Sequence, residues 1–453
     1  MTTAVKPNCR LNLKTLRCLL GALVVTGSAG AGAVTFTEAY QAALKNDPNY
    51  RMNFYENEYA KENVVIGRAG LLPNVGFNYQ ASRNRVDLNG QDFLGRPTLT
   101  HPEYISRAAS VSLRQPLLNL EAIARYRQSR VQSEASEAQF RTHGGEVVLR
   151  VAGAYLDALL ASDALALAKA QRDMYAEQTK VNGRLFEKGE GTRTDMLETA
   201  ARLDQAEAQV LEAEDAVTTN RNSLAVVIGM EPGTLQALVP TFRFAPLSPR
   251  GFDEWRAIAL ATNPDLQAAQ LAVEAARLEV QKARAGHAPR IDLVATYSKN
   301  DAETVNTYTQ NSVNRSIGVQ VNIPLYAGGQ ISAITRQAVD GYERAKADQQ
   351  ARTDRVTIEL RKAHSLAVSS VARIEALNKA VTSAQLLIKA TEQSIKGGVR
   401  INLDLLNAQQ QLTSVERDLA QARYGYLVAL LRLRAAAGTL APSDVTEVAA
   451  YFR

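Results

Sequence analysis

Arg68-Ala-Gly-Leu-Leu-Pro73 and Arg284-Ala-Gly-His-Ala-Pro289 are versions of one short motif, 216 residues apart. At the same spacing, Asn46-Asp-Pro48 matches Thr262-Asn-Pro264. Two later pairs follow in the same order: Val111–Leu117 matches Val319–Leu325, and Gly189–Gly229 matches Gly398–Gly438. Alanine-rich helices can produce one such match by chance, but four in register indicate that the 453-residue chain contains two copies of one unit.

Each unit contains a long tract without proline, between Pro116 and Pro232 and between Pro324 and Pro442. Proline breaks helices, so these alanine-, glutamine- and glutamate-rich tracts predict long helices. Glycines interrupt each tract and predict a tight helix–turn–helix. These glycines are Gly189 and Gly191 in the first unit and Gly397 and Gly398 in the second.

After each turn, apolar residues recur every seven positions, which is typical of a coiled coil. The two series begin Met196, Leu203, Val210, Val217, Leu224 and Leu405, Leu412, Leu419, Tyr426, Leu433. The arm before the first turn, residues 117–188, predicts a helix of roughly 108 Å. The return arm 192–228 and the helical pattern 37–71 together match its length, so we expect them to stack end to end beside it.

Each unit also carries two segments in which apolar and polar residues alternate, which predicts β-strands. They lie within 74–115 in the first unit and 290–323 in the second. A half-buried sheet in a water-soluble protein and a membrane β-barrel both produce this alternation, so the strands alone leave both readings open. The polar stretches 87–103 and 300–314 are predicted to be long outer loops.

Four strands are too few to close a barrel, for which about eight are needed. In a membrane, several chains would have to pool their strands, and three chains would give twelve. The apolar residues predicted to face lipid are Phe77, Tyr79, Val111, Leu293, Tyr297 and Val319. The polar residues predicted to face the lumen are Asn78, Gln80, Ser110, Gln320 and Asn322.

The first 33 residues have the layout of a secretory signal peptide. A cationic stretch ending at Arg17 precedes an apolar run and then small residues, with Ala31-Gly-Ala33 matching a cleavage site. The chain's two cysteines, Cys9 and Cys18, lie within this leader. The exported chain is therefore expected to have neither a disulfide nor a cysteine metal site.

Composition argues against nucleic-acid binding and against catalysis. The net charge is +6, but four basic residues and no acid lie in the leader, so little of this charge belongs to the exported part. The histidines His101, His143, His287 and His364 are too scattered for a ligand set, and motifs for nucleophile, zinc or phosphate sites are missing. We therefore expect no enzymatic activity, no cofactor, no metal and no nucleic-acid partner.

The chain resembles the TolC-type outer-membrane exit ducts of Gram-negative bacteria. The resemblance rests on the duplicated helix start at Pro48 and Pro264, the exit into a strand at Pro73 and Pro289, and above all the segment 398–409. That segment, Gly-Val-Arg-Ile-Asn-Leu-Asp-Leu-Leu-Asn-Ala-Gln, is similar to the family's turn motif. The resemblance covers roughly residues 36–440.

The resemblance implies a mainly α, α+β fold that forms a homotrimer, with a shared twelve-stranded outer-membrane barrel on a periplasmic helical tunnel. It implies that the duct docks onto a periplasmic adaptor and an inner-membrane transporter of the RND or ABC type, and carries drugs, metals or proteins outward. The implied divisions are a signal peptide (1–33), a first repeat (34–229), an equatorial linker (230–253), a second repeat (254–438) and a C-terminal equatorial segment (439–453).

A periplasmic coiled-coil adaptor or scaffold is the alternative, since such proteins are also exported, helical and partly β. An adaptor has one helical hairpin flanked by β domains, whereas here each of two hairpins follows its own strand pair. The duplicated strands therefore favour the duct.

The two hairpin turns are predicted to form the periplasmic mouth, with the four turn glycines in the surface that docks the adaptor. The resemblance places Asp404 at the pore, with Asp195 as its counterpart, so that a trimer would carry a ring of three Asp404 carboxylates. Many relatives have a second acid where this chain has Asn407. The remaining predicted gate residues are Arg193, Thr194 and Arg400. The arginines are expected to hold the mouth shut through charge-assisted hydrogen bonds. Ordinary helix-start and surface charges would look the same in the sequence.

Overall fold

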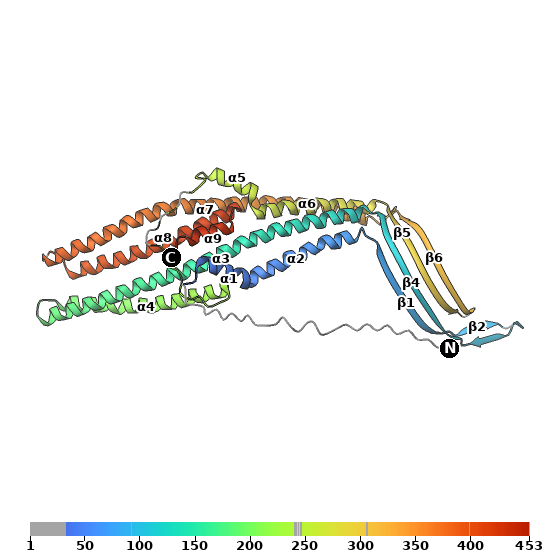
Figure 1. The fold of residues 1–453 in the computed structure, drawn as a ribbon, viewed down its shortest axis with the longest axis horizontal. Coiled ribbons are helices and arrows are strands. Elements are labelled where there is room, and N and C mark those ends of the chain that lie inside the picture. Colours follow the sequence, from blue (N-terminus) through green and yellow to red (C-terminus); the bar gives the residue numbers. More distant parts are fainter. Residues whose placement is uncertain are drawn as a thin grey trace, which may run out of the picture.

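The computed structural model describes residues 33–452, apart from residues 92, 240, 241, 243, 245, 246, 305, 306 and 398. The predicted signal peptide thus falls almost entirely outside the described residues. The described chain is elongated, with a four-stranded sheet at one end and helices that run lengthwise away from it (Figure 1).

The same order of elements occurs twice: two helices, two long strands, a long helix and a shorter return helix. The first set is α1 (Phe36–Asn46), α2 (Pro48–Ala69), β1 (Asn74–Arg85), β4 (Glu103–Leu118), α3 (Leu120–Glu187) and α4 (Arg193–Ile228). The second set is α5 (Phe252–Thr262), α6 (Pro264–Arg284), β5 (Arg290–Thr304), β6 (Thr307–Asn322), α7 (Gln330–Lys396) and α8 (Asn402–Ala437). A small hairpin of β2 (Leu88–Gln91) and β3 (Pro97–Thr100) follows β1, a 3₁₀ turn η1 (Ala285–His287) follows α6, and α9 (Pro442–Ala449) follows α8.

The expectation of one continuous helix over residues 37–71 is wrong, because the chain breaks at Asp47. Pro48 lacks a backbone N–H and disfavours a helical conformation at the residue before it. Asp47 is accordingly extended, and its carboxylate caps α2 by accepting from the Asn49 amide at 2.9 Å. Asn263 and Pro264 produce the same break between α5 and α6.

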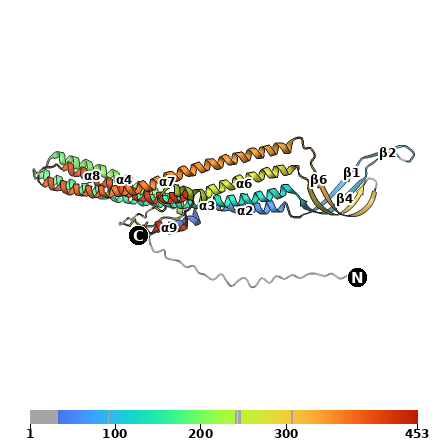
Figure 2. The same ribbon diagram turned by 90° about the horizontal axis from the view of Figure 1, so that it is seen from above.

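The C-terminal ends of the return helices contact these breaks. Asn46 Nδ2 donates to the carbonyl oxygen of Ile228 at 2.9 Å, at the end of α4. Asn263 Nδ2 donates to the carbonyl oxygen of Ala436 at 2.8 Å, near the end of α8. Gly438 has a φ of +74°, and a Cβ added there would lie 2.4 Å from the Cα of Asn263, so glycine is required at this close approach. α2 and α4 both pack along α3, and α6 and α8 both pack along α7 (Figures 1 and 2).

The predicted coiled-coil seam is clearest in α8. Of its five seam residues, Leu405, Leu419, Tyr426 and Leu433 are buried, and Leu412 is half-buried. In α4 the corresponding series is less covered within one chain: Val210 and Leu224 are buried, but Met196, Leu203 and Val217 are only half-buried. The second hairpin therefore packs its seam more completely than the first.

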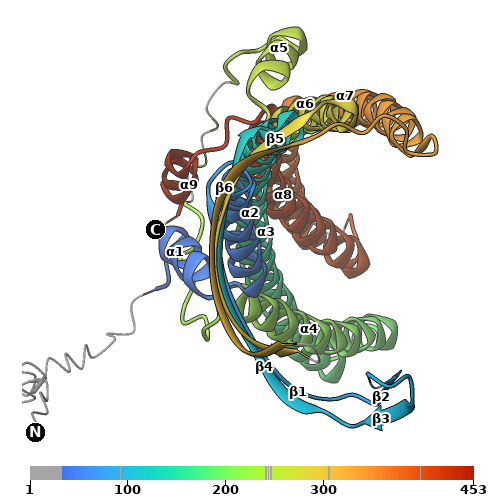
Figure 3. The same ribbon diagram turned by 90° about the vertical axis from the view of Figure 1, so that its right-hand side faces the viewer.

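The four long strands form one antiparallel sheet in the order β1-β4-β5-β6, and the sheet curves into an arc (Figure 3). The expectation of a long loop at 300–314 is wrong, because those residues extend β5 to Thr304 and begin β6 at Thr307. The other predicted loop, 87–103, contains the β2–β3 hairpin. The outer edges of the sheet, β1 and β6, have no strand partner among the described residues.

The strand register sorts the side chains onto two faces, because directly paired residues point the same way. Phe77 pairs with Val111, and Val111 with Tyr297. Asn78 pairs with Ser110 on the other face. The residues predicted to face lipid therefore share one face, and it is exposed: Phe77 is 71% accessible and Val319 is 61% accessible.

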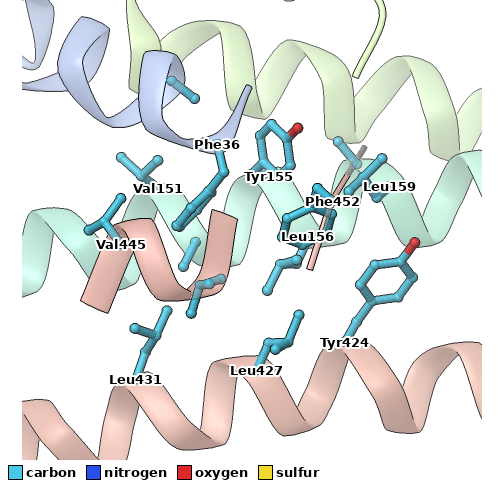
Figure 4. Close-up of a cluster of buried hydrophobic side chains, with 14 of the residues drawn as sticks. Phe36, Val151, Tyr155, Leu156, Leu159, Tyr424, Leu427, Leu431, Val445 and Phe452 are labelled. Carbon is cyan, nitrogen blue, oxygen red and sulfur yellow. The ribbon is translucent and has the colours of Figure 1, made fainter. Parts of the chain in front are cut away.

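The largest apolar core lies at mid-height, where α1 and α9 pack against α3 and α8 (Figure 4). Tyr155 of α3 is fully buried at its centre, with its ring 5.5 Å from that of Phe36 and 5.7 Å from that of Phe452. Its hydroxyl donates to the carbonyl oxygen of Val34 at 2.9 Å and accepts from the Gln236 amide at 3.2 Å. Burial raises the pKa of Tyr155 to about 12.

In the C-terminal segment expected to form part of an equatorial belt, α9 lies on the outside of the arc, beside α1 (Figure 3). The C-terminal stretch is held firmly: Arg434 of α8 bonds Asp444 and Glu447, each at 2.7 Å. Among the described residues, α3 is the one helix long and apolar enough to cross a membrane, and part of that stretch lies buried in the mid-height core.

Candidate functional site

The turn between α3 and α4 is built by two glycines with different roles. Gly189 has a φ of +75°, a left-handed conformation that reverses the chain after α3. Gly191 lies so close to the end of α3 that an added Cβ would be 3.1 Å from the Leu185 Cβ and the Phe186 nitrogen. Thr192 then caps α4 by accepting from the Asp195 amide at 3.1 Å. Both predicted docking glycines therefore shape this turn.

The turn between α7 and α8 leads into a helix without a side-chain cap. Gly397 ends α7, and Gly398 lies outside the described residues. Ile401 occupies the N-cap of α8 and, being apolar, makes no side-chain cap. Val399 is 82% accessible and Ile401 62%, so this end of the molecule presents apolar side chains to its surroundings.

Asp195 and Asp404 occupy equivalent places, the third residue of α4 and of α8. Exposed helix N–H groups favour a carboxylate at this position. Their immediate partners differ, because the Thr192 hydroxyl lies 2.5 Å from the Asp195 carboxylate. Asp404 has no side-chain hydrogen bond among the described residues, and it is half-buried. Of the two predicted acids, Asp404 is thus the one whose charge remains available.

Arg193, Thr194 and Arg400 are exposed at the same end of the molecule. Within the described part of one chain, neither arginine forms an ion pair with Asp195 or Asp404. The predicted arginine–carboxylate contacts are therefore not made inside a single copy. Contacts of this kind would have to join neighbouring copies.

The structure brings Asn407 to a residue that the sequence reasoning missed. Arg202 of α4 donates to Asn407 Oδ1 at 3.2 Å and to Gln410 Oε1 at 2.7 Å, both on α8. Nearby, Gln178 Nε2 of α3 donates to Asn402 Oδ1 at 2.9 Å. These bonds tie the first hairpin to the second close to both turns. The sequence signal was slight: Arg202 follows Asp195 by seven residues and so shares its helix face.

A second tie lies further from the turns. The Tyr424 hydroxyl of α8 donates to Asp163 Oδ2 of α3 at 2.7 Å. Asp163 lies 24 residues before the end of α3, which places this bond roughly 36 Å from the turn. Burial raises the pKa of the Asp163 carboxyl, an effect opposed by the hydrogen bond from Tyr424. Between the two levels Tyr175, Ala206 and Leu406 form a small buried cluster across the hairpins.

No group of three or more metal-ligating side chains comes together in the part of the chain that the structure describes. A cavity of about 950 Å³ lies at mid-height between α3, α7 and α8. Its lining includes His143, Glu146, Glu359, Lys362 and Arg432.

Comparison with known proteins identifies the family. A sequence model described as outer membrane efflux protein matches residues 39–230 and 255–439. The chain belongs to the outer membrane efflux protein family. It is an outer-membrane channel with a long periplasmic extension, and the alternative of a periplasmic adaptor does not apply.

Relatives in the family span nearly the whole chain. The alkaline protease secretion protein AprF of Pseudomonas aeruginosa is 39% identical over 96% of this chain and 90% of its own length. The proteases secretion protein PrtF of Dickeya chrysanthemi is 35% identical over 96% and 95%. The outer membrane protein TolC of Vibrio cholerae is 28% identical over 96% and 98%.

Solved structures show the same fold. The CmeC outer membrane channel of Campylobacter jejuni superposes with a TM-score of 0.78 at 17% identity, over 100% of this chain and 98% of that one. The open-state MtrE channel of Neisseria gonorrhoeae gives 0.74 at 20% identity, over 90% and 91%.

Asp163 gives a prediction for stability against pH. The pKa of the Asp163 carboxyl is raised in the folded chain, so the folded chain binds a proton more readily than the unfolded chain. The ionised carboxylate therefore lowers the free energy of unfolding at neutral pH. This cost falls as the pH drops through the native pKa. Asp163→Asn keeps an acceptor for Tyr424 without the charge. We expect it to raise the melting temperature by about 2 °C at pH 7.5 and by less at pH 5, followed by circular dichroism of the helices.

Asp204→Asn on α4 is the matched control, because Asp204 is exposed and has no ion pair among the described residues. It is expected to change the melting temperature little at either pH. A loss of stability in Asp163→Asn that is larger at pH 7.5 than at pH 5 would show that the ionised carboxylate stabilises the fold, contrary to this account.

Proposed function

We propose that the chain is the homotrimeric outer-membrane duct of a type I protein secretion system, working with a periplasmic adaptor and an ABC-type inner-membrane transporter. The observation that carries the cargo assignment is the ordering of the relatives. Two proteins named for protease secretion are 39% and 35% identical to this chain. Relatives named for efflux, BepC of Brucella suis and TtgC of Pseudomonas putida, are 28% and 23% identical. The runner-up is drug export with an RND-type transporter, which the same fold also supports.

The proposed trimer follows from the sheet. Its four strands leave β1 and β6 with unpaired backbone groups, and free strand edges readily pair with another chain. Inside a lipid bilayer those groups would be left without partners, so only a closed barrel satisfies them. Three curved sheets joined edge to edge would give twelve strands, well above the minimum of about eight.

The proposed gate is formed by the turns of the second hairpin, with those of the first around it. Around a three-fold axis, Asp404 would contribute three carboxylates to one ring, which favours cations. Arg193 and Arg400 lack acidic partners among the described residues of one chain, so in a trimer they are available to the carboxylates of a neighbouring copy. Opening would also require the bonds of Arg202 to Asn407 and Gln410 to shift. The adaptor would engage the exposed turns that contain Gly189, Gly191, Gly397 and Gly398. We propose that the duct holds no cofactor and catalyses no reaction.

Secretion tests the cargo assignment. The chain is expressed in a Gram-negative host that lacks its own duct of this family, together with the transporter and adaptor of a protease secretion system. We expect the protease in the medium, because the duct completes the route across the outer membrane. Val319→Arg, on the apolar face of the sheet, should abolish export, since a lipid-facing arginine costs about 2–4 kcal/mol at mid-bilayer.

Gln320→Arg is the matched control, because it places the same side chain one residue away on the polar face of the same strand. It should export nearly as well as the unmodified chain. The runner-up would be favoured by two results together. The chain exports no protease with the protease secretion system, and it restores drug resistance when the drug pump's own adaptor is supplied instead.

Single-channel recording in a planar bilayer tests the gate. Arg400→Ser should raise the conductance at least about twofold, because it removes a cation that holds neighbouring turns together. Asp404→Ala should reduce the preference for cations, because it removes the carboxylate ring. Arg184→Ser, an exposed site on α3 just before the turn, is the control and should leave both quantities unchanged. If neither gate variant differs from this control, the constriction lies elsewhere in the tunnel.

A further inference from the structure

Three basic side chains lie together on one face of the sheet, one on each of three neighbouring strands: Arg107 on β4, Lys299 on β5 and Arg315 on β6. Lys299 pairs with Ala109, two residues along β4 from Arg107. Arg315 pairs with Tyr297, two residues along β5 from Lys299. Consecutive members are therefore diagonal neighbours, roughly 7–8 Å apart, within reach of long side chains. All three side chains are exposed. We call them the basic cluster.

The basic cluster is on the lipid-facing side of the sheet. Arg315 pairs with Tyr297, and Tyr297 with Val111, in the row that also contains Phe77. The opposite face carries polar residues such as Asn78 and Ser110. Because the apolar face of a membrane barrel contacts lipid, these cations point toward lipid rather than into the lumen.

The cluster also lies toward the cell exterior. The helices join the sheet at one end (Figure 1). That end faces the periplasm, because the helices form the periplasmic extension of the channel. Arg107 lies 11 residues from the helix-side end of β4, and Lys299 lies nine from that of β5. At roughly 2.5 Å of height per tilted residue, they reach about 23–28 Å, the outer border of the apolar band. Arg315 lies seven residues from the helix-side end of β6, roughly 18 Å up and within the band, and its long side chain can extend outward to the border. Its guanidinium lies 5.6 Å from the centre of the Tyr297 ring, an aromatic residue of the kind found at membrane borders.

The cluster lacks neutralising partners among the residues that the structure describes. Arg83 and Arg85, further out on the same face, share Glu103 at 2.8 and 3.8 Å. By contrast, none of the three cluster residues forms an ion pair among the described residues, although Asp301 is opposite Arg107 in the register. An unpaired cation at the edge of the hydrocarbon is costly, and an anion supplied by the surrounding lipid would relieve that cost.

We propose that Arg107, Lys299 and Arg315 bind the phosphorylated headgroup of lipid A, the lipid of the outer leaflet of this membrane. Guanidinium and ammonium groups bind phosphate through charge-assisted hydrogen bonds, and Arg does so in a bidentate fashion. Three cations on adjacent strands can contact both phosphates of one headgroup while its acyl chains lie on the apolar band below. The site rests on the outer-membrane location of the sheet and is independent of which cargo the duct exports.

The test uses the full-length protein in detergent, incubated with bisphosphorylated lipid A and analysed by native mass spectrometry. The variant is Arg107→Gln/Lys299→Gln/Arg315→Gln. The control, Lys45→Gln/Arg256→Gln/Lys379→Gln, removes the same charge from exposed positions on α1, α5 and α7. We expect the unmodified chain and the control to retain lipid A, and the cluster variant to retain at least fivefold less. Dephosphorylated lipid A should not be retained by any of them.

Three results would overturn the proposal: equal retention by the cluster variant, equal retention of phosphatidylglycerol, or complete displacement of lipid A by millimolar inorganic phosphate. The second would indicate a surface for any anionic lipid, and the third a small-anion site. If the triple variant does not assemble, Lys299→Gln alone should lose at least twofold, and Lys299→Arg should retain lipid A. Protease export, measured in parallel, should continue in every assembled variant. Failure of the proposed export function is therefore distinguishable from failure of the lipid site.

Discussion

An antiparallel sheet of four strands with two free edges constrains the rest of this molecule. One face carries Phe77, Val111 and Val319 in the open, and β1 and β6 have backbone groups that no described strand pairs. In a single copy, the exposed apolar face is unfavourable in water, and the unpaired strand edges are unfavourable in lipid. The curvature of the sheet and the lengthwise helices behind it fit a shared barrel that continues into a shared tunnel. The proposed lipid A site at the basic cluster requires that this face lies on the outside of such a barrel.

In the helical part, short helices pair with long ones. Breaks at Asp47 and Asn263 let two helices share the length of one long helix, and Asn46 and Asn263 bond the carbonyl groups that end α4 and α8. The two hairpins are then joined by the mid-height core and by the buried cluster of Tyr175, Ala206 and Leu406. Nearest the turns they are joined by the polar bonds from Arg202 to α8. Polar bonds can exchange partners at small net cost, whereas an apolar seam resists separation. In the proposed gate, the polar contacts nearest the turns are therefore the ones that can change most easily.

Sequence periodicity was sufficient for the long helices, the four strands and their apolar face, because each follows from a repeat of local pattern. It failed where local pattern and spatial neighbours differ. Residues 300–314 are polar, yet they continue β5 and β6, because pairing between adjacent strands outweighs the weak strand preference of single residues. The duplication and the family resemblance placed Asp195 and Asp404 near the turns, but they could not show that Thr192 engages only the first of them. Arg202–Asn407 joins residues 205 apart, a distance at which periodicity carries no information.

The mass of the detergent-solubilised assembly tests the central claim most directly. Residues 34–453 contain no cysteine, so once the predicted signal peptide is removed, adventitious disulfides cannot imitate an assembly. Native mass spectrometry, with the detergent removed in the gas phase, should give three times the mass of the mature chain and no larger species, because three sheets close the ring. A stable single chain, or a series of masses that continues beyond three, would contradict the closed twelve-stranded barrel.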